Sequence, residues 1–384
     1  GQWDRAAKAF ENAYNLNPFE KTIKQNLVSA VIMYSQQLNS AGTTATAIQW
    51  LEFVIKVDPE NVRPLNQLGA YLLASGNVAS AIFRLEESIE LEPDDINAHF
   101  LLGEAYYKDN DVTAAVDQWE WVYKIDPEYR GLQNRLENAL REEQVEFDFH
   151  GDSSRNFNVT YSKEAERELV RDVLKILESA YKEVGRSLGS TYPPTPIQVS
   201  LYTTEGFFES TQQGQHVGAL YDGTKIRCPV IDEKGNSIPI KVLRDRLYHE
   251  YVHVVVHHMT KDNVPWWFNE GLAETLSSDM STNEKRVLKK AYDGGTLYKF
   301  DEITPRDLLN TLSPEELSLA YAQSHLAVAY LRQRYGERQL TRMLESLKEG
   351  MEGEEALRDA YGISYRALNE RLGSAIGPTR IRGD

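Results

Sequence analysis

The segment PENVRPLNQLGAYLLASGNVASAIFRLEESIELEP, residues 59–93, is framed by two prolines that each close a similar phrase, FVIKVDP and SIELEP. A third such phrase, VYKIDP, closes at Pro127, so Pro59, Pro93 and Pro127 lie 34 residues apart. A fixed period of this length is typical of repeat arrays. The sequence therefore predicts stacked repeats in the first part of the chain.

Residues at fixed offsets from these prolines support the repeat. The recurring positions hold small or bulky apolar residues, namely Ala47, Ala81 and Ala115, then Leu51, Leu85 and Trp119, and the glycines Gly69 and Gly103. The small residues predict positions where two helices approach closely. Pro18 extends the series backwards but lies 41 residues before Pro59, and we expect the seven extra residues in a longer turn within QQLNSAGTTAT, residues 36–46.

This stretch resembles the tetratricopeptide repeat (TPR) family, whose unit is a helical hairpin of about 34 residues. The resemblance covers roughly residues 1–140, with Leu65 and His99 at positions where the family often has tryptophan. The first repeat retains only its second helix. The resemblance implies an α-solenoid whose concave groove binds peptides or partner proteins. The alternative is that the array only braces the rest of the chain.

Composition narrows the class of partner. The formal net charge of -16 argues against a nucleic acid as the main partner, because long-range repulsion would oppose binding. A single cysteine, Cys228, excludes an internal disulfide and a cysteine-rich zinc site. The sequence has no apolar run of about 18 residues, so we expect no membrane span.

The repeat pattern ends after Arg141, where the sequence changes from a charged helix to an alternating pattern. Val145, Phe147 and Phe149 recur with a period of two, which predicts a strand. We therefore place a repeat domain at residues 1–142, a second domain at 148–377 and a tail at 378–384. In the second domain, residues 162–186 have helical spacing with Ser162 as a plausible cap.

Two segments after this helix are rich in β-formers, PPTPIQVSLYTT (193–204) and VGALYDGTKIRCPVI (217–231), and YDGT predicts a tight turn. A small mixed sheet with helices is an α+β arrangement. The whole chain is therefore predicted to be α+β and mostly helical.

The stretch HEYVHVVVHHM, residues 249–259, holds four of the eight histidines, on a helix expected to start after Pro239. His249 and His253 are one turn apart, so both imidazoles project from the same face and can share one ion. Glu250 stands beside them as a candidate general base. This is the H-E-x-x-H pattern of zinc hydrolases. The alternative is a core helix with hydrogen-bonded histidines.

A carboxylate that could complete this site follows in PWWFNEGLAETLS, residues 265–277. Glu270 comes after a gap of 16 residues from His253, at the start of an expected second helix. Two histidines and one carboxylate leave a fourth position open, which is the arrangement of a catalytic zinc.

The phrases HEYVH and WFNEGLAE resemble the gluzincin metallopeptidases, and within them the peptidase-MA-like domains. At the level of fold the resemblance covers about residues 148–377. It implies that Glu270 is the third Zn²⁺ ligand and that Glu274 is the acid that orients a ligand histidine. The gap before Glu270 is slightly shorter than in the best-known members, so we expect a tighter loop between the two helices.

Further candidates lie around this core. His257 stands eight residues after His249, about 12 Å along a helix, which is too far to share one ion. In related enzymes a downstream tyrosine or histidine stabilises the oxyanion. The phrase YAQS resembles this element, and it makes Tyr321 the first candidate and His325 the second. The alternative for both is a packed helix. The segment GALYDGTKIRC, residues 218–228, is a candidate edge strand for an extended peptide.

These features predict a zinc-dependent peptidase in which Glu250 is the general base and the TPR array binds a peptide or protein substrate or a protein partner. The alternative is a scaffold or chaperone-like protein with a structural or vestigial zinc site. Chains of this kind resemble exported bacterial proteins, so we expect the periplasm or another exported location, with the cytoplasm as the alternative.

Overall fold

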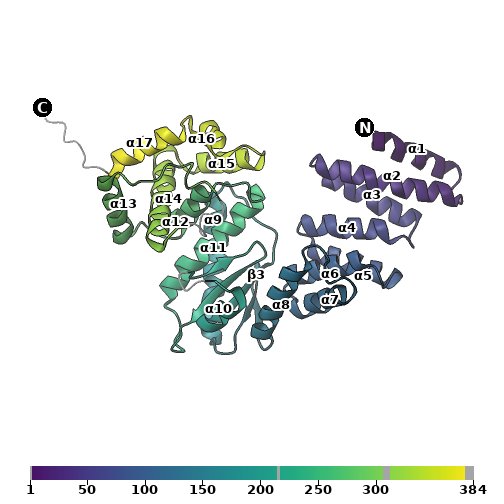
Figure 1. The fold of residues 1–384 in the computed structure, drawn as a ribbon, viewed down its shortest axis with the longest axis horizontal. Coiled ribbons are helices and arrows are strands. Elements are labelled where there is room, and N and C mark those ends of the chain that lie inside the picture. The colour runs from purple at the N-terminus through teal and green to yellow at the C-terminus, as the bar shows by residue number, and fades with distance from the viewer. Residues whose placement is uncertain (1, 214–216, 306–311, 377–384) are drawn as a thin grey trace. The chain divides into compact units, whose positions relative to one another are not determined.

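The computed structural model describes residues 2–213, 217–305 and 312–376 (Figure 1). The chain divides into two compact units, one of residues 1–147 with 209–211 and the other of residues 148–208 with 212–384. The predicted tail at 378–384 lies outside the described residues.

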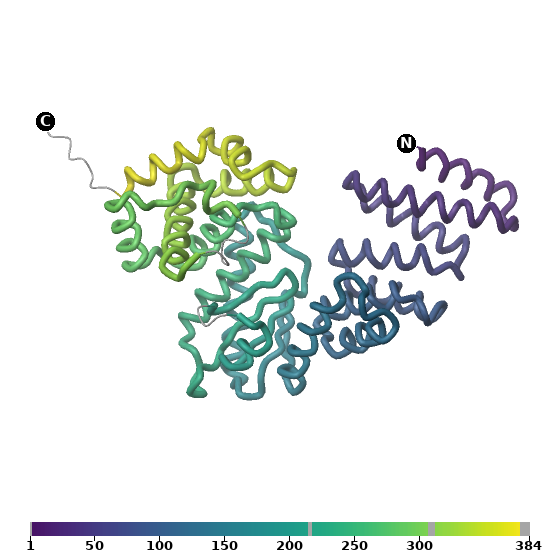
Figure 2. Tube along the Cα trace, viewed as in Figure 1, coloured from purple at the N-terminus to yellow at the C-terminus, as the bar shows by residue number. Residues whose placement is uncertain are grey.

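The first unit is a series of antiparallel helices that follow one another along the chain (Figure 2). Its helices are α1 (Gln2–Leu16), α2 (Lys21–Ser40), α3 (Thr44–Val57), α4 (Val62–Ala74), α5 (Val78–Leu91), α6 (Ile96–Lys108), α7 (Val112–Ile125) and α8 (Leu132–Glu146). The repeat prolines follow the ends of α3, α5 and α7, where proline cannot continue a helix. The helices that follow Pro59 and Pro93 begin at polar caps; Asp95, for example, accepts the N–H groups of Asn97 and Ala98.

The small repeat residues lie where helices touch, as predicted. A Cβ on Gly69 would lie 2.6 Å from Cγ of Leu85, and one on Gly103 would lie 2.4 Å from Nε1 of Trp119. These close approaches explain the equal offsets of Gly69 and Leu85 and of Gly103 and Trp119 from their prolines. The TPR prediction is thus confirmed at the level of packing.

Two local predictions in this unit are wrong. The seven extra residues do not lengthen a turn. Instead, α2 continues to Ser40, and the turn closes within three residues at Gly42, whose φ is 76°. The strand expected at residues 145–149 is also absent, because the charged helix continues through Val145 and ends at Glu146. In both places good helix formers precede the predicted turn or strand, and they favour continuation of the helix.

The second unit contains a small mixed sheet with the order β1-β2-β3-β5-β4 (Figure 1). Its strands are β1 (His150–Ser153), β2 (Phe157–Tyr161), β3 (Ile197–Thr203), β4 (Leu220–Tyr221) and β5 (Lys225–Ile231). β2, β3 and β5 are parallel, whereas β1 and β4 run antiparallel at the two edges. The predicted YDGT turn joins β4 to β5, with Gly223 at a φ of 91° and the Asp222 carboxylate accepting two main-chain N–H groups.

Helices surround this sheet and form the larger part of the unit. They are α9 (Arg167–Ser187), α10 (Thr204–Thr211), α11 (Ile240–Thr260), α12 (Trp266–Ser277), α13 (Thr282–Gly294), α14 (Pro314–Tyr335), α15 (Glu337–Lys348), α16 (Gly353–Tyr361) and α17 (Tyr365–Ile376). α9 begins later than predicted, because Ser162 bonds Glu164 and the helix is preceded by Glu166. α11 begins after Pro239, as predicted, and packs against α9, α12 and β5.

The fold is therefore α+β and mostly helical, as the sequence predicts. One continuous apolar core joins the sheet, α9, α11, α12 and the later helices. This core fixes α11 and α12 side by side, and these two helices carry the candidate ligands. Within the described ranges, no helix is both long and apolar enough to cross a membrane.

Candidate metal centre

Helices α11 and α12 bring together the three residues that the sequence singles out as metal ligands. The Glu270 Oε2 atom lies 3.4 Å from Nε2 of His249 and 3.6 Å from Nε2 of His253. One potential ligand atom from each residue lies within 4.8 Å of the other two. A single carboxylate oxygen from α12 thus lies close to both imidazoles of α11.

The spacing of these atoms fits a small divalent cation. Ligand atoms placed about 2.1 Å from one zinc ion at tetrahedral angles lie about 3.4 Å from each other. The two measured separations, 3.4 and 3.6 Å, are close to this value. Two imidazole nitrogens with one carboxylate oxygen are also the donor types that zinc prefers. The residues present therefore fit the metal ion that the resemblance implies.

The charges of the three groups depend on one another. Burial opposes ionisation of Glu270, but the adjacent His253 and His249 outweigh it and hold the pKa of this carboxyl well below its usual range. Burial also disfavours the charged form of His253, yet the charge of Glu270 raises the pKa of the imidazole. The carboxylate thus stays ionised, as a metal ligand must.

Each candidate ligand histidine has a polar neighbour at its second ring nitrogen. Nδ1 of His253 lies 3.1 Å from Oδ1 of Asn269, and Nδ1 of His249 lies 3.7 Å from Oε1 of Glu274. Such partners fix the ring orientation and leave Nε2 for a metal ion. Glu274, which the resemblance implies as the acid that orients a ligand histidine, lies beside the candidate ligand His249. The role of Asn269 was not predicted, although this residue stands directly before Glu270 in the NEG phrase.

Glu250 is held by the edge of the sheet. Its Oε2 atom accepts a hydrogen bond of 2.7 Å from the main-chain N–H of Tyr221, in β4. The carboxylate is buried, and its second oxygen makes no hydrogen bond with any described residue. The donor is a main-chain group, which explains why no side-chain pattern in the sequence predicts this contact.

Tyr321 lies on α14 close to the site carboxylates. Burial raises the pKa of its hydroxyl far above the usual value, and the negative charges of Glu270, Glu250 and Glu274 raise it further. Its ring packs edge-on against Trp266 with centroids 5.1 Å apart. Tyr321 therefore keeps its proton and remains a hydrogen-bond donor beside the candidate ligands.

A glycine brings α12 and α14 close together. A Cβ on Gly271 would lie 2.4 Å from the main-chain oxygen of Ser324 and 2.5 Å from Cγ2 of Val328. Only the absence of a side chain lets the two helices approach this closely. Because Gly271 directly follows Glu270, this contact positions the candidate ligand with respect to Tyr321.

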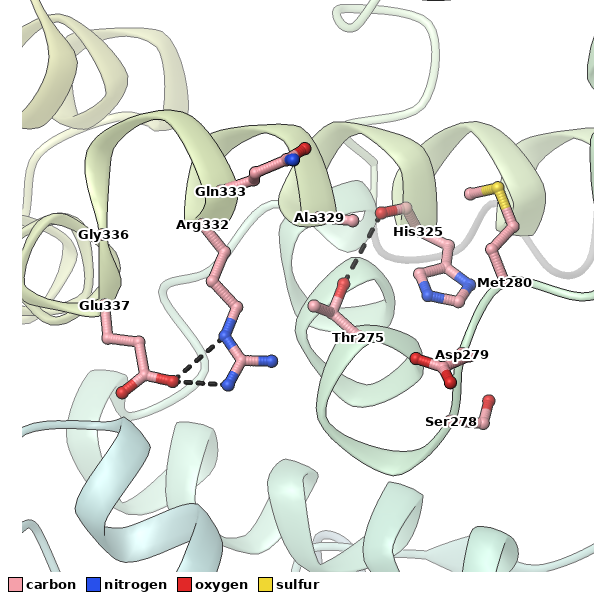
Figure 3. A pocket seen from close by; sticks show the side chains of 10 residues that line it. All are labelled: Thr275, Ser278, Asp279, Met280, His325, Ala329, Arg332, Gln333, Gly336 and Glu337. Atoms are coloured by element: carbon pink, nitrogen blue, oxygen red, sulfur yellow. Dashed lines mark hydrogen bonds and ion pairs between the residues drawn. The ribbon is translucent and has the colours of Figure 1, made fainter.

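His325 is one helical turn beyond Tyr321 but faces other residues. Its Nδ1 lies 2.8 Å from Oε1 of Glu284, on α13. The buried ring borders a cavity of about 450 Å³ whose other walls include Thr275 and Asp279 (Figure 3). His325, Glu284 and Glu274 form a second group whose potential ligand atoms lie within 4.8 Å of one another. The structure thus places His325 with Glu284 rather than in the group of His249, His253 and Glu270.

His257 and Trp267, which lie near the candidate ligands in the sequence, both have partners within the fold. Nδ1 of His257 lies 2.7 Å from Oδ1 of Asp262, just beyond the end of α11. Trp267 is fully buried, packs against Phe300 and donates from Nε1 to the Tyr365 hydroxyl at 3.3 Å. Trp267 therefore anchors the start of α12.

Comparison with known families agrees with these two parts of the chain. Residues 237–377 match the family model described as Peptidase MA superfamily, and residues 72–110 match a TPR repeat model. No curated protein matches the chain. The first match covers α11 to α17 and hence every candidate ligand, and both resemblances seen in the sequence are confirmed.

Proposed function

We propose that this chain is a zinc-dependent peptidase whose metal ligands are His249, His253 and Glu270. One observation carries the proposal: the Oε2 atom of Glu270 lies 3.4 and 3.6 Å from the Nε2 atoms of the two histidines. The match to the Peptidase MA superfamily supports a hydrolytic, peptidase-like domain. Asn269 and Glu274 lie beside the Nδ1 atoms of the two imidazoles, which supports an orientation that presents Nε2 to the metal ion.

A zinc ion bound there supplies a Lewis acid that polarises the scissile carbonyl and makes the attacking water more acidic. Glu250 accepts the proton of that water and then passes it to the leaving amine. The Tyr221 N–H holds one oxygen of the Glu250 carboxylate, so the other oxygen remains available for this proton. Tyr321 donates a hydrogen bond to the carbonyl oxygen as negative charge develops on it.

The position of β4 indicates how a substrate binds. This short strand is the last in the sheet and lies antiparallel to β5, so an extended peptide can add along its other side by main-chain hydrogen bonds. Tyr221 belongs to β4 and contacts Glu250, and this places the general base next to such a peptide. We infer that the TPR unit binds a protein, either the substrate or a partner, through its concave face.

The test combines metal analysis with hydrolysis. Protein reconstituted with zinc is incubated with a broad peptide library, and cleavage is measured by mass spectrometry with and without a chelator. We expect chelator-sensitive cleavage that Glu250→Gln lowers by at least a hundredfold, because the general base is lost. His257→Gln is the matched control, since this imidazole lies on the same helix outside the ligand group. Bound zinc without any Glu250-dependent cleavage would favour the scaffold function.

A further inference from the structure

Arg246 lies on the same face of α11 as the candidate catalytic groups. It precedes His249 by three residues and Glu250 by four, which is about one helical turn. The offset along the helix axis is therefore about 4.5 to 6 Å. Arg246 is partly buried, so its side chain lies between the protein interior and the surface.

The guanidinium of Arg246 lacks the partners that its environment requires. Its Nη1 atom is buried and has no hydrogen-bond partner among the residues that the structure describes. Across the described residues, Arg246 has no ion pair, hydrogen bond or ring contact of any kind. By contrast, Arg244 on the same helix bonds the Ser277 carbonyl oxygen and covers the ring of Tyr248. Burying a cation without a partner is unfavourable, so Arg246 calls for an anion from outside the chain.

The surroundings of Arg246 place this charge beside the general base. A Cβ on Gly218 would lie 2.9 Å from Nε and 3.2 Å from Cζ of Arg246, so the guanidinium lies against the main chain just before β4. Burial raises the pKa of the Cys228 thiol on β5 to about 12, while the charge of Arg246 opposes this rise and that of Glu250 adds to it. Arg246 and Glu250 thus both approach β5 near its neighbour β4.

Glu250 does not neutralise this arginine. Its carboxylate is bonded to the Tyr221 N–H, and no ion pair joins it to Arg246 in the described part of the chain. A guanidinium presents a planar fork of donors that matches the two oxygens of a carboxylate. An extended peptide advances about 3.3 Å per residue. The offset of about 4.5 to 6 Å between Arg246 and the candidate catalytic groups along α11 therefore corresponds to one or two residues of such a peptide.

We propose that Arg246 binds a carboxylate of the substrate, one or two residues from the scissile bond. This inference rests on the proposed peptidase function and names its substrate class, which is peptides with an acidic side chain or a free C-terminus at that position. Because the chain has a net charge of -16, attraction is local rather than long-range. Recognition depends on direct contact with the partly buried guanidinium, and added salt screens such a contact only weakly.

Binding is tested in the zinc-loaded Glu250→Gln variant of residues 1–384, which retains the site but not the general base. The probes are fluorescent octapeptides in matched pairs: Asp against Asn at each position with an amidated C-terminus, and neutral peptides with a free against an amidated C-terminus. We expect the protein to bind the carboxylate-bearing peptide at least tenfold more tightly than its neutral partner, either in the Asp/Asn pair at one position or in the pair that differs at the C-terminus. Arg246→Met should abolish that preference, whereas Lys241→Met, the same charge change at an exposed position on α11, should preserve it.

Steady-state kinetics in the active background separate recognition from catalysis. For the preferred acidic peptide, Arg246→Met should raise KM at least tenfold while kcat changes less than threefold, and its Tm should not fall. Cleavage that ignores carboxylates would overturn the inference and leave the peptidase function standing. Carboxylate binding that depends on Arg246, without any cleavage, would refute the peptidase function and leave Arg246 as a binding site for peptide carboxylates. A loss of folding in Arg246→Met would be checked with Gly218→Ala, which crowds the same guanidinium and should lower the same preference.

Discussion

The contact of Gly271 with α14 makes a quantitative prediction about the metal centre. In Gly271→Ala the new Cβ would lie 2.4 Å from the Ser324 carbonyl oxygen, a main-chain atom that no side-chain rotation can move. An ordinary contact is about 3.4 Å, so α12 must move away from α14 by about 1 Å, at a cost of about 1–3 kcal/mol. Glu270, the adjacent residue, moves with it.

Because ligand placement is sensitive to shifts of this size, zinc affinity should fall about 10- to 100-fold. The matched control is Gly294→Ala on α13, where the new Cβ meets only Thr296, at 3.9 Å. That substitution should keep the zinc affinity and raise stability by about 0.5–1 kcal/mol, as alanine does in an open helical position. Thermal unfolding and zinc titration against a competing chelator measure both effects. Equal Tm and equal zinc affinity for the two alanine variants would refute this reasoning.

Three further predictions concern other parts of the chain. Asn269→Ala removes the partner of His253 and should weaken zinc binding about tenfold in the same titration, with little change in Tm. Gly103→Ala drives a Cβ into the Trp119 ring and should lower the stability of the TPR unit by about 1–3 kcal/mol, measured by urea unfolding. Burial opposes ionisation of Glu178, but hydrogen bonds from Ser154 and Asn156 outweigh it and lower its pKa. The stabilisation that ionised Glu178 provides is therefore complete above the pKa of this carboxyl in the unfolded chain. It is lost as the pH falls through the lower pKa of the carboxyl in the folded protein. Glu178→Gln should cost about 1 kcal/mol at pH 7 and less at pH 3, and an equal cost at both would contradict the role of these hydrogen bonds.

The repeat unit was predictable because its determinants are local and periodic. Pro59, Pro93 and Pro127 each follow the end of a helix, which a proline cannot continue. The glycines at equal offsets from Pro93 and Pro127 face the same neighbour position in each repeat. The errors arose where two local signals competed. At residues 145–149 the period of two predicted a strand, but the preceding helix formers extended α8 to Glu146.

The arrangement of the candidate metal centre was predictable only in part. The spacing of His249 and His253 on one helix fixes their common face, and the resemblance supplied Glu270 and Glu274. The Tyr221 contact with Glu250 could not be predicted, because a main-chain N–H has no signature in the sequence. Neither could the pairing of His325 with Glu284, which depends on how α13 packs against α14.

Two adjacent groups of residues could hold a metal ion, so the alternative to the proposed site is an ion bound by the second group. Glu274 is close to His249 on one side and belongs with Glu284 and His325 on the other. The second group already contains a direct hydrogen bond between His325 and Glu284, which a metal ion would have to displace. The first group has its Nε2 atoms directed toward Glu270 and its Nδ1 atoms toward other partners. We therefore expect zinc at the first group.

Locating the bound ion tests this expectation most directly. Crystals of the zinc-loaded protein, measured at the zinc absorption edge, should show one anomalous peak about 2.0–2.2 Å from His249 Nε2, His253 Nε2 and a Glu270 carboxylate oxygen. A peak among Glu274, Glu284 and His325 instead, or full zinc loading with no peak at the first group, would contradict the account.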